Sequence, residues 1–110
     1  MKAMPAASEF EMTLLFRRVN GPFRVRLTVA DDFIEVAPAV PWPFSRLRAF
    51  RATRVAAPDV AAVEGDAPSR RGVRVRTASG LLDRFVLVPT RRHQRADIHA
   101  AVIAHGYVLE

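Results

Sequence analysis

Residues 23–36, FRVRLTVADDFIEV, contain the clearest two-residue period in the chain, over residues 23–29, followed by a short acidic turn and a second apolar segment. Every second residue of 23–29 is apolar, and the residues between them are arginine or threonine. This two-residue period places the apolar side chains on one face of a strand. Asp31 and Asp32 predict a polar turn, and residues 33–36 predict the returning strand. The apolar face of this hairpin must pack against the rest of the chain.

The alternation extends toward the N-terminus. Residues 10–17 repeat the two-residue period, and the Asn-Gly-Pro run at 20–22 supplies a turn before the next strand. We expect these residues and the hairpin to form a three-stranded meander. Residues 1–8 show no periodicity, so we expect a flexible leader followed by a single domain over residues 9–110.

The second half of the chain predicts further strands. Residues 37–44 contain three prolines and predict an extended connector or an edge segment. Residues 45–55 alternate again with one slip of phase, which is typical of a bulge. Residues 56–72 predict a loop that contains one short strand. Residues 73–77 and 81–88 predict a hairpin.

Helical spacing is confined to the C-terminal end. Apolar residues recur at intervals of three and four between Ile98 and His105, which predicts an amphipathic helix. Thr90 is suited to its N-cap and Gly106 to a left-handed C-cap. The sequence therefore predicts an α+β, mainly β domain, in which about seven short antiparallel strands are covered by one C-terminal helix.

Composition sets the class of protein. The chain has 110 residues, of which 50% are hydrophobic, and it has no cysteine. This length supports one hydrophobic core, and the lack of cysteine excludes disulfide frameworks and thiolate zinc sites. Lys and Arg number 17 against 11 Asp and Glu, and the formal net charge of +6 favours anionic partners. No apolar run reaches the length of a membrane span, so we expect a cytoplasmic protein.

Four segments in this order resemble bacterial pleckstrin-homology-like (PH-like) domains. They are VADDFIEV at 29–36, VPWPFSRLRAF at 40–50, GVRVRTASGLLDRFVLVP at 72–89 and DIHAAVIAHG at 97–106. The resemblance covers about residues 10–108 and implies a split barrel of seven antiparallel strands that one C-terminal helix caps. Members of this family commonly bind lipid head groups, peptides or other proteins. This chain departs from ligand-binding relatives in its short turn at 20–22, where they often carry a longer loop.

The resemblance implies an anion-binding site near the start of the domain. Relatives that bind phosphoinositides carry basic residues where this chain has Arg18, Arg24 and Arg26. Alternation places Arg24 and Arg26 on the same outward face, and guanidinium groups pair well with phosphate oxygens. The alternative interpretation is that arginine simply faces solvent on a half-buried strand.

Other residues are candidate contacts with a partner or a membrane. Trp42 stands between two prolines, where an indole either anchors in a partner or membrane interface or packs on its own barrel. Arg74 and Arg76 belong to the acid-free basic segment 70–76. Together with the basic segment 91–95, it carries the electrostatic footprint of a nucleic-acid binder.

The search for catalytic, metal and cofactor sites is negative. His93, His99 and His105 are six residues apart, so no two share a helix face as metal ligands do. We expect them at the surface, with His105 as a charge near the helix C-terminus. Asp31 and Asp32 are expected to be solvent-facing turn residues. We therefore expect no enzymatic activity and no cofactor.

The sequence favours a non-catalytic binding module. The leading hypothesis is a protein or peptide partner, bound through a strand edge and the loop around Trp42. The first alternative is anionic phospholipid at the inner face of the membrane, bound through Arg18, Arg24 and Arg26. The second alternative is nucleic acid, bound through the arginine clusters. A homodimer formed through a strand edge or the helix is also left open.

Overall fold

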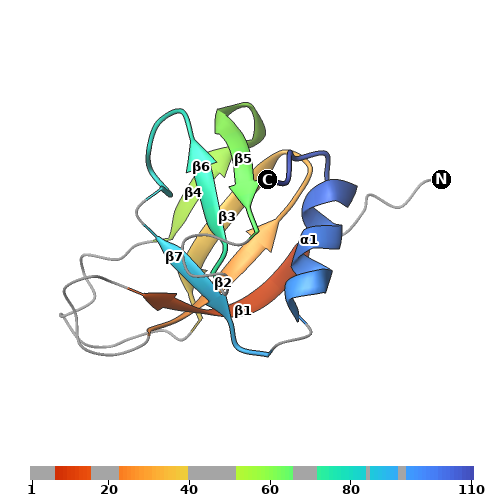
Figure 1. The fold of residues 1–110 in the computed structure, drawn as a ribbon. Coiled ribbons are helices and arrows are strands. Elements are labelled where there is room, and N and C mark those ends of the chain that lie inside the picture. Colours follow the sequence, from red (N-terminus) through yellow and green to blue (C-terminus); the bar gives the residue numbers. More distant parts are fainter. Residues whose placement is uncertain (1–6, 16–22, 40–51, 66–71, 84, 92–93) are drawn as a thin grey trace.

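The computed structural model describes residues 7–15, 23–39, 52–65, 72–83, 85–91 and 94–110. Within these residues the chain forms seven strands, one 3-10 turn and one α-helix (Figure 1). In chain order they are β1 (Ser8–Leu15), β2 (Phe23–Val29), β3 (Phe33–Pro38), β4 (Thr53–Ala56), the 3-10 turn (Ala57–Asp59), β5 (Val60–Glu64), β6 (Arg74–Thr77), β7 (Val86–Pro89) and α1 (Gln94–Ala104). β1 thus begins at the last residue of the predicted leader, and residues 1–6 lie outside the described residues.

Five strands form one antiparallel sheet in the order β4-β3-β2-β1-β7. The predicted hairpin at its centre is confirmed, because Val29 of β2 pairs with Ile34 of β3. β1 pairs with β2, with Met12 opposite Val25, so the predicted three-stranded meander is confirmed as well. The apolar residues from Val25 to Val29 that face inward are each 1% exposed, whereas the arginines between Phe23 and Leu27 are exposed. The two-residue period therefore identified the buried face.

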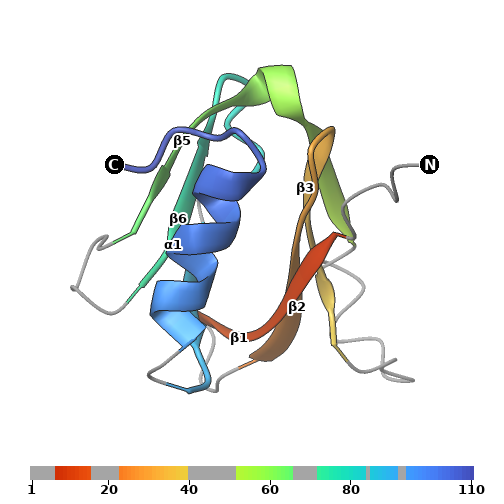
Figure 2. The same ribbon diagram turned by 90° about the vertical axis from the view of Figure 1, so that its right-hand side faces the viewer.

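β5 and β6 form a second, two-stranded sheet, which faces the first across the core (Figure 2). The short strand predicted within residues 56–72 is confirmed as β5. Segment 108–110 lies along β5 in the parallel direction. Val63 N–H donates to the Val108 carbonyl at 2.8 Å, and Glu110 N–H donates to the Val63 carbonyl at 2.8 Å. The C-terminal residues therefore extend the backbone hydrogen bonding of this sheet.

The predicted hairpin between residues 73–77 and 81–88 is wrong. β6 pairs with β5, and β7 pairs with β1. Within the described residues these two segments meet at a bridge between Val73 and Leu87. Between them the chain bends away from β6, and Leu82 in this bend is buried. The first part of the apolar run, residues 81–83, is thus a turn with one buried leucine, whereas its last part is β7 (Val86–Pro89). Hydrophobicity alone does not distinguish such a turn from a strand.

α1 covers the open side between the two sheets (Figure 2). Ile98, Ala101 and Val102 are its buried residues, which confirms the predicted apolar face. They meet side chains from both sheets in one continuous core. The largest fully buried side chains of the core are Met12, Leu27, Ile34, Leu82, Leu87 and Ile98.

The sequence predicted a capping residue for each end of α1. Gly106 has a φ of +88°, which confirms the predicted left-handed C-cap. Residues 92 and 93, to whose N–H groups an N-cap at Thr90 would bond, lie outside the described residues, so the N-cap stays a prediction. The Thr90 hydroxyl donates to the Glu11 carbonyl at 3.2 Å, so it ties the turn before α1 to β1.

Strand pairing among the described residues does not close into a barrel. The 3-10 turn Ala57–Asp59 connects β4 to β5, which belong to different sheets. The mainly β class with one C-terminal helix is confirmed, and the end of the predicted strand 45–55 is found as β4. Arg18 and Trp42 lie outside the described residues. Within the described ranges no helix combines the length and the apolar character that crossing a membrane requires.

Truncating the helix core is the first prediction. Ile98→Ala should lower the free energy of unfolding by about 3 kcal/mol, because Ile98 is fully buried and its loss leaves a cavity. Ile103→Ala on the same helix is the matched control, because Ile103 is 62% exposed. Its effect should stay within about 0.5 kcal/mol. Urea unfolding measures both, and equal effects of the two variants would contradict the packing described here.

Candidate functional site

Two of the three arginines predicted to bind an anion lie on one face of the five-stranded sheet. Arg24 and Arg26 of β2 are exposed on the outward face of the five-stranded sheet, as alternation predicted. Arg24 Nη1 lies 3.7 Å from Glu11 Oε1 of the neighbouring β1. Arg18 lies outside the described residues. The structure therefore brings two of the three predicted residues together and gives one of them a carboxylate partner.

The outward face of this sheet is balanced in charge. Within the described strands it carries three arginines and three glutamates, which are Arg24, Arg26, Arg54, Glu9, Glu11 and Glu35. Arg54 Nε lies 3.6 Å from Glu35 Oε1, and the Arg54 guanidinium lies 3.9 Å from the centroid of the Phe33 ring. An anionic surface that approaches this face meets as many carboxylates as guanidinium groups, which limits its attraction.

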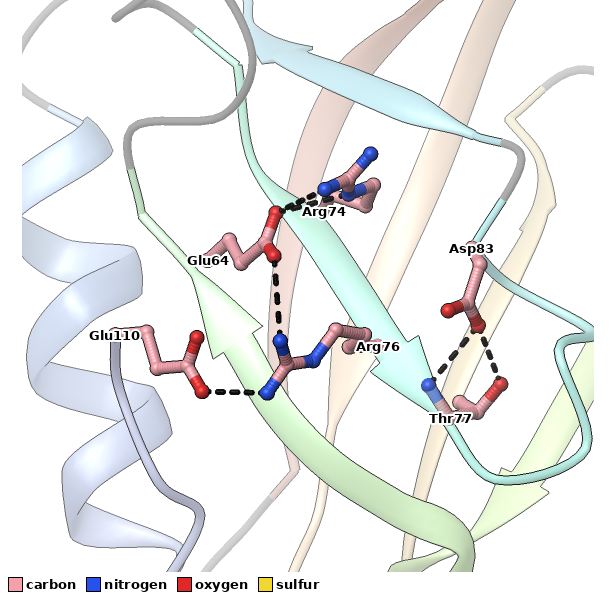
Figure 3. Close-up of polar contacts among 6 residues, drawn as sticks. All are labelled: Glu64, Arg74, Arg76, Thr77, Asp83 and Glu110. Atoms are coloured by element: carbon pink, nitrogen blue, oxygen red, sulfur yellow. Dashed lines mark hydrogen bonds and ion pairs between the residues drawn. The ribbon is translucent and has the colours of Figure 1, made fainter.

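Arg74 and Arg76, the predicted partner contacts, belong to a chain of ion pairs across the second sheet (Figure 3). Arg74 Nη2 lies 2.7 Å from Glu64 Oε2, and Arg74 Nε donates to the same oxygen at 2.8 Å. Arg76 Nη1 lies 3.9 Å from Glu64 Oε1, and Arg76 Nη2 donates to Glu110 Oε1 at 2.6 Å. Positive and negative side chains thus alternate along this chain of ion pairs, in the order Arg74, Glu64, Arg76 and Glu110.

Glu64 is the centre of this chain of ion pairs. Its side chain is 16% exposed, whereas those of Arg76 and Glu110 are each 45% exposed. Coulomb attraction is screened least where solvent is most excluded, so the short pair between Arg74 and Glu64 is the strongest of the set. A phosphate that bound Arg74 or Arg76 would compete with Glu64 and Glu110 for the same guanidinium groups.

A carboxylate fixes the end of β6. Thr77 donates to Asp83 Oδ1 from its N–H at 3.0 Å and from its hydroxyl at 2.8 Å (Figure 3). Burial acts to raise the pKa of Asp83, but the bonds from Thr77, with help from its own backbone and from Arg74, hold that pKa below its ordinary value of 3.8. The resulting stabilisation is present above that ordinary value and is lost as the pH falls through the folded-state pKa.

The C-terminal end of α1 holds a cluster that the sequence analysis missed. The expectation that His105 lies at the surface is wrong, because its side chain is only 6% exposed. His105 Nδ1 lies 2.6 Å from Asp31 Oδ1 in the β2–β3 turn, and His105 Nε2 lies 3.2 Å from Ser8 Oγ in β1. These partners are 74 and 97 residues away in sequence, and no local spacing signals such contacts.

Tyr107 lies beside this cluster. Its hydroxyl donates a hydrogen bond to the Ala30 carbonyl. Burial, followed by the carboxylates of Asp32 and Asp31, raises the pKa of Tyr107 to about 12, because each of these disfavours the phenolate. The phenol therefore stays neutral and remains a hydrogen-bond donor at physiological pH.

Two side chains tie α1 to the end of β5. Arg95 Nη2 donates to the Gly65 carbonyl at 3.2 Å, and His99 Nε2 lies 3.4 Å from the same oxygen. A Cβ on Gly65 would lie 2.5 Å from His99 Nε2, so the His99 ring would have to shift to admit any larger residue there. His93 lies outside the described residues, and within those residues no group of three or more acidic or histidine side chains is placed to hold a metal ion.

Neutralising the central carboxylate is the second prediction. Glu64→Gln should lower the free energy of unfolding by about 1 kcal/mol, because it removes the charge between two arginines in a poorly solvated position. Glu11→Gln is the control, since its pair with Arg24 is largely exposed. It should change stability by roughly 0.3 kcal/mol or less. Urea unfolding at low salt compares them, and an equal loss for both would contradict this ranking.

Tyr107 gives the third prediction, and it is the only tyrosine in the chain, so its phenolate absorbance can be followed directly. We expect its titration midpoint at about 12 in the folded protein, against an ordinary value of 10.0. Since the folded-state pKa is raised, the stabilisation is present below the ordinary value and is lost as the pH rises toward about 12. Asp32→Asn should lower the midpoint, and an unchanged midpoint would contradict the charge effect.

Comparison with known proteins adds no family assignment. No protein-family model matches this chain, and neither the curated proteins nor the solved structures contain a match. The resemblance to PH-like domains therefore rests on the sequence segments and their order.

Proposed function

We propose that this protein is a binding module that takes an extended peptide segment of a partner protein along the outer edge of β4. One observation carries the proposal. β4 is the end strand of the five-stranded sheet, and β3 is its only pairing partner within the described residues. Such an edge offers backbone donors and acceptors to an added strand.

The β3–β4 ladder indicates which groups a peptide would use. Ala57 N–H donates to the Asp32 carbonyl at 2.9 Å, so the backbone of Ala57 faces β3. Along an antiparallel ladder the residues that bond to the neighbour alternate with residues that bond outward. Val55 therefore also bonds to β3, whereas Arg54 and Ala56 direct their N–H and carbonyl groups away from it. The backbone N–H and carbonyl groups of these two residues are the groups to which a peptide would hydrogen-bond.

The side chains around this edge favour an acidic ligand. Arg54 is exposed beside the outer edge, and its guanidinium has only Glu35 as a carboxylate neighbour within the described residues. Residues 46–54 contain four arginines and no acid in sequence. An extended peptide in which acidic and apolar residues alternate would pair with these cations while its other face packs on the sheet. Trp42, which precedes β4 in sequence, stays a proposed contact.

The strand order supports a PH-like split barrel as the architecture of this module. β1 to β4 follow one another as neighbours, β5 and β6 form the second sheet, and α1 follows the last strand. The resemblance implies this same succession. The bridge between Val73 and Leu87 links the two sheets at one corner, as the proposed architecture requires.

Anionic phospholipid is the second candidate ligand, and Arg26 favours it. Arg26 is exposed, and within the described residues no carboxylate lies in ion-pair range of its guanidinium. The charge balance of the outward face counts against this candidate. Nucleic-acid binding through Arg74 and Arg76 has less support, because both are paired with carboxylates.

Blocking the β4 edge is the fourth prediction. Ala56 has φ −70° and ψ 149°, which proline adopts without strain, and its N–H is not needed by β3. Ala56→Pro should keep the fold but weaken binding of a labelled peptide of alternating glutamate and valine at least about fivefold, because one donor is lost and the edge is obstructed. Ala56→Ser, which keeps the N–H, should bind as the unchanged protein does. Fluorescence anisotropy measures the affinities.

The outcomes of this experiment separate the candidate ligands. Equal affinity of the Ala56→Pro variant and the unchanged protein would contradict the proposal, as would equal binding of a lysine–valine peptide. Sedimentation with phosphatidylserine vesicles tests the second candidate, and vesicle binding that is lost in Arg24→Ala/Arg26→Ala would favour lipid. Retention of an oligonucleotide at low salt, without peptide binding, would favour nucleic acid.

A further inference from the structure

Three residues far apart in sequence meet at the C-terminal end of α1. Ser8 Oγ lies 3.2 Å from His105 Nε2, and Asp31 Oδ1 lies 2.6 Å from His105 Nδ1. From these contacts we propose that the cluster is an acyl-transfer site, in which Ser8 is the nucleophile, His105 the general base and Asp31 the group that orients the imidazole. Serine, histidine and aspartate in this linear arrangement are recognised by geometry and not by their order in sequence.

The hydrogen bonds assign the roles of the two ring nitrogens. An ionised carboxylate only accepts hydrogen bonds, so the contact with Asp31 places a hydrogen on His105 Nδ1. In the neutral imidazole Nε2 then carries the lone pair. With the imidazole neutral, the Ser8 hydroxyl donates to that lone pair across the 3.2 Å contact, and a base activates a serine through a hydrogen bond of this kind.

Burial holds this arrangement in place. The His105 side chain is 6% exposed, so the imidazole has little freedom to leave its two partners. Ser8 is only partly buried at the beginning of β1, so part of this residue is in contact with solvent. The Asp31 side chain is 60% exposed, so water competes with its hold on the ring. Loss of Asp31 should therefore matter less than loss of Ser8 or His105.

The strand pairing supplies a donor for the oxyanion. Ala30 N–H bonds to β3, so by alternation its neighbour Val29 bonds to β1, where Ser8 is its partner. Ser8 therefore directs its own N–H toward β2, and the next N–H, that of Glu9, points to the opposite edge of β1. Pairing with β7 reaches along β1 only as far as Met12. We assign the Glu9 N–H to the oxyanion, since the residue after a nucleophilic serine is a common donor.

The surrounding charges indicate the class of substrate. Asp31 and Asp32 are both exposed in the turn beside the cluster, and their carboxylates repel an anionic substrate. Phe10, two residues from Ser8 on the same face of β1, is partly buried and offers an apolar contact for a short acyl chain. The site thus fits an uncharged carboxylic ester with a short acyl group.

The proposed reaction balances without any co-reactant except water. Ser8 Oγ bonds to the ester carbonyl carbon while its proton passes to His105 Nε2. The bond from that carbon to the alcohol oxygen breaks, and the alcohol leaves with the proton. Water then attacks the acyl-serine and gives a proton to Nε2, which returns it to Ser8 Oγ as the carboxylic acid departs.

Hydrolysis of p-nitrophenyl acetate by the full chain tests the site. Ser8→Ala and His105→Gln should each lower the rate at least roughly tenfold, because general-base catalysis of a nucleophile is worth more than that. Asp31→Asn should give a smaller loss. Ser79→Ala is the matched control, because Ser79 lies on a turn and contacts Asp59 instead of a histidine. A Ser8→Ala variant that hydrolyses the ester at the unchanged rate would overturn the proposal.

Two further measurements separate the proposal from a purely structural role of the cluster. Mass spectrometry after reaction with a fluorophosphonate should find the adduct on Ser8, and an adduct elsewhere or none at all would overturn the site. The chain has no cysteine, so Ser8→Cys creates a single thiol. Iodoacetamide should alkylate it faster than it alkylates Ser8→Cys/His105→Gln, and equal rates would overturn the role of His105. Neither measurement involves the β4 edge, so peptide binding is judged separately.

Discussion

The burial of one face of β2 is the constraint on which the rest of the structure depends. Val25, Leu27 and Val29 are almost fully buried, and β2 has a paired strand on each side. Covering each such side chain contributes roughly 1.5–3 kcal/mol, a large share of the stability of a small domain. A single curved sheet leaves this face exposed to water. The second sheet and α1 are therefore needed to cover it.

The C-terminal residues provide much of this cover and are held at several points. α1 has 11 residues, a length at which an isolated helix is marginal in water. Ile98 anchors it in the core, Gly65 allows its close approach to β5, and Tyr107 bonds to the β2–β3 turn. Segment 108–110 then pairs with β5. The helix thus owes its stability to tertiary contacts more than to its own sequence.

Net charge alone does not identify the ligand of this protein, because several of the described arginines lie close to carboxylates. The chain carries a formal charge of +6, yet Arg24, Arg54, Arg74 and Arg76 each have a carboxylate nearby. Attraction of anions by these residues is therefore reduced. Within the described part of the chain, the two features proposed to have a function are the backbone edge of β4 and the cluster around His105. These features support peptide binding and acyl transfer respectively.

Local sequence patterns located the β2–β3 hairpin and the end of the helix, because alternation fixes which face of a strand is apolar and glycine fixes where a left-handed residue can stand. Residues 23–36 and Gly106 show this directly. Long-range packing sets the pairing of β7 with β1, the entry of Leu82 into the core from a turn, and the contacts of His105 with Ser8 and Asp31. A repeat of two or of 3.6 residues carries no information about which distant segment lies alongside. Those contacts depend on how the apolar faces of the elements pack against one another.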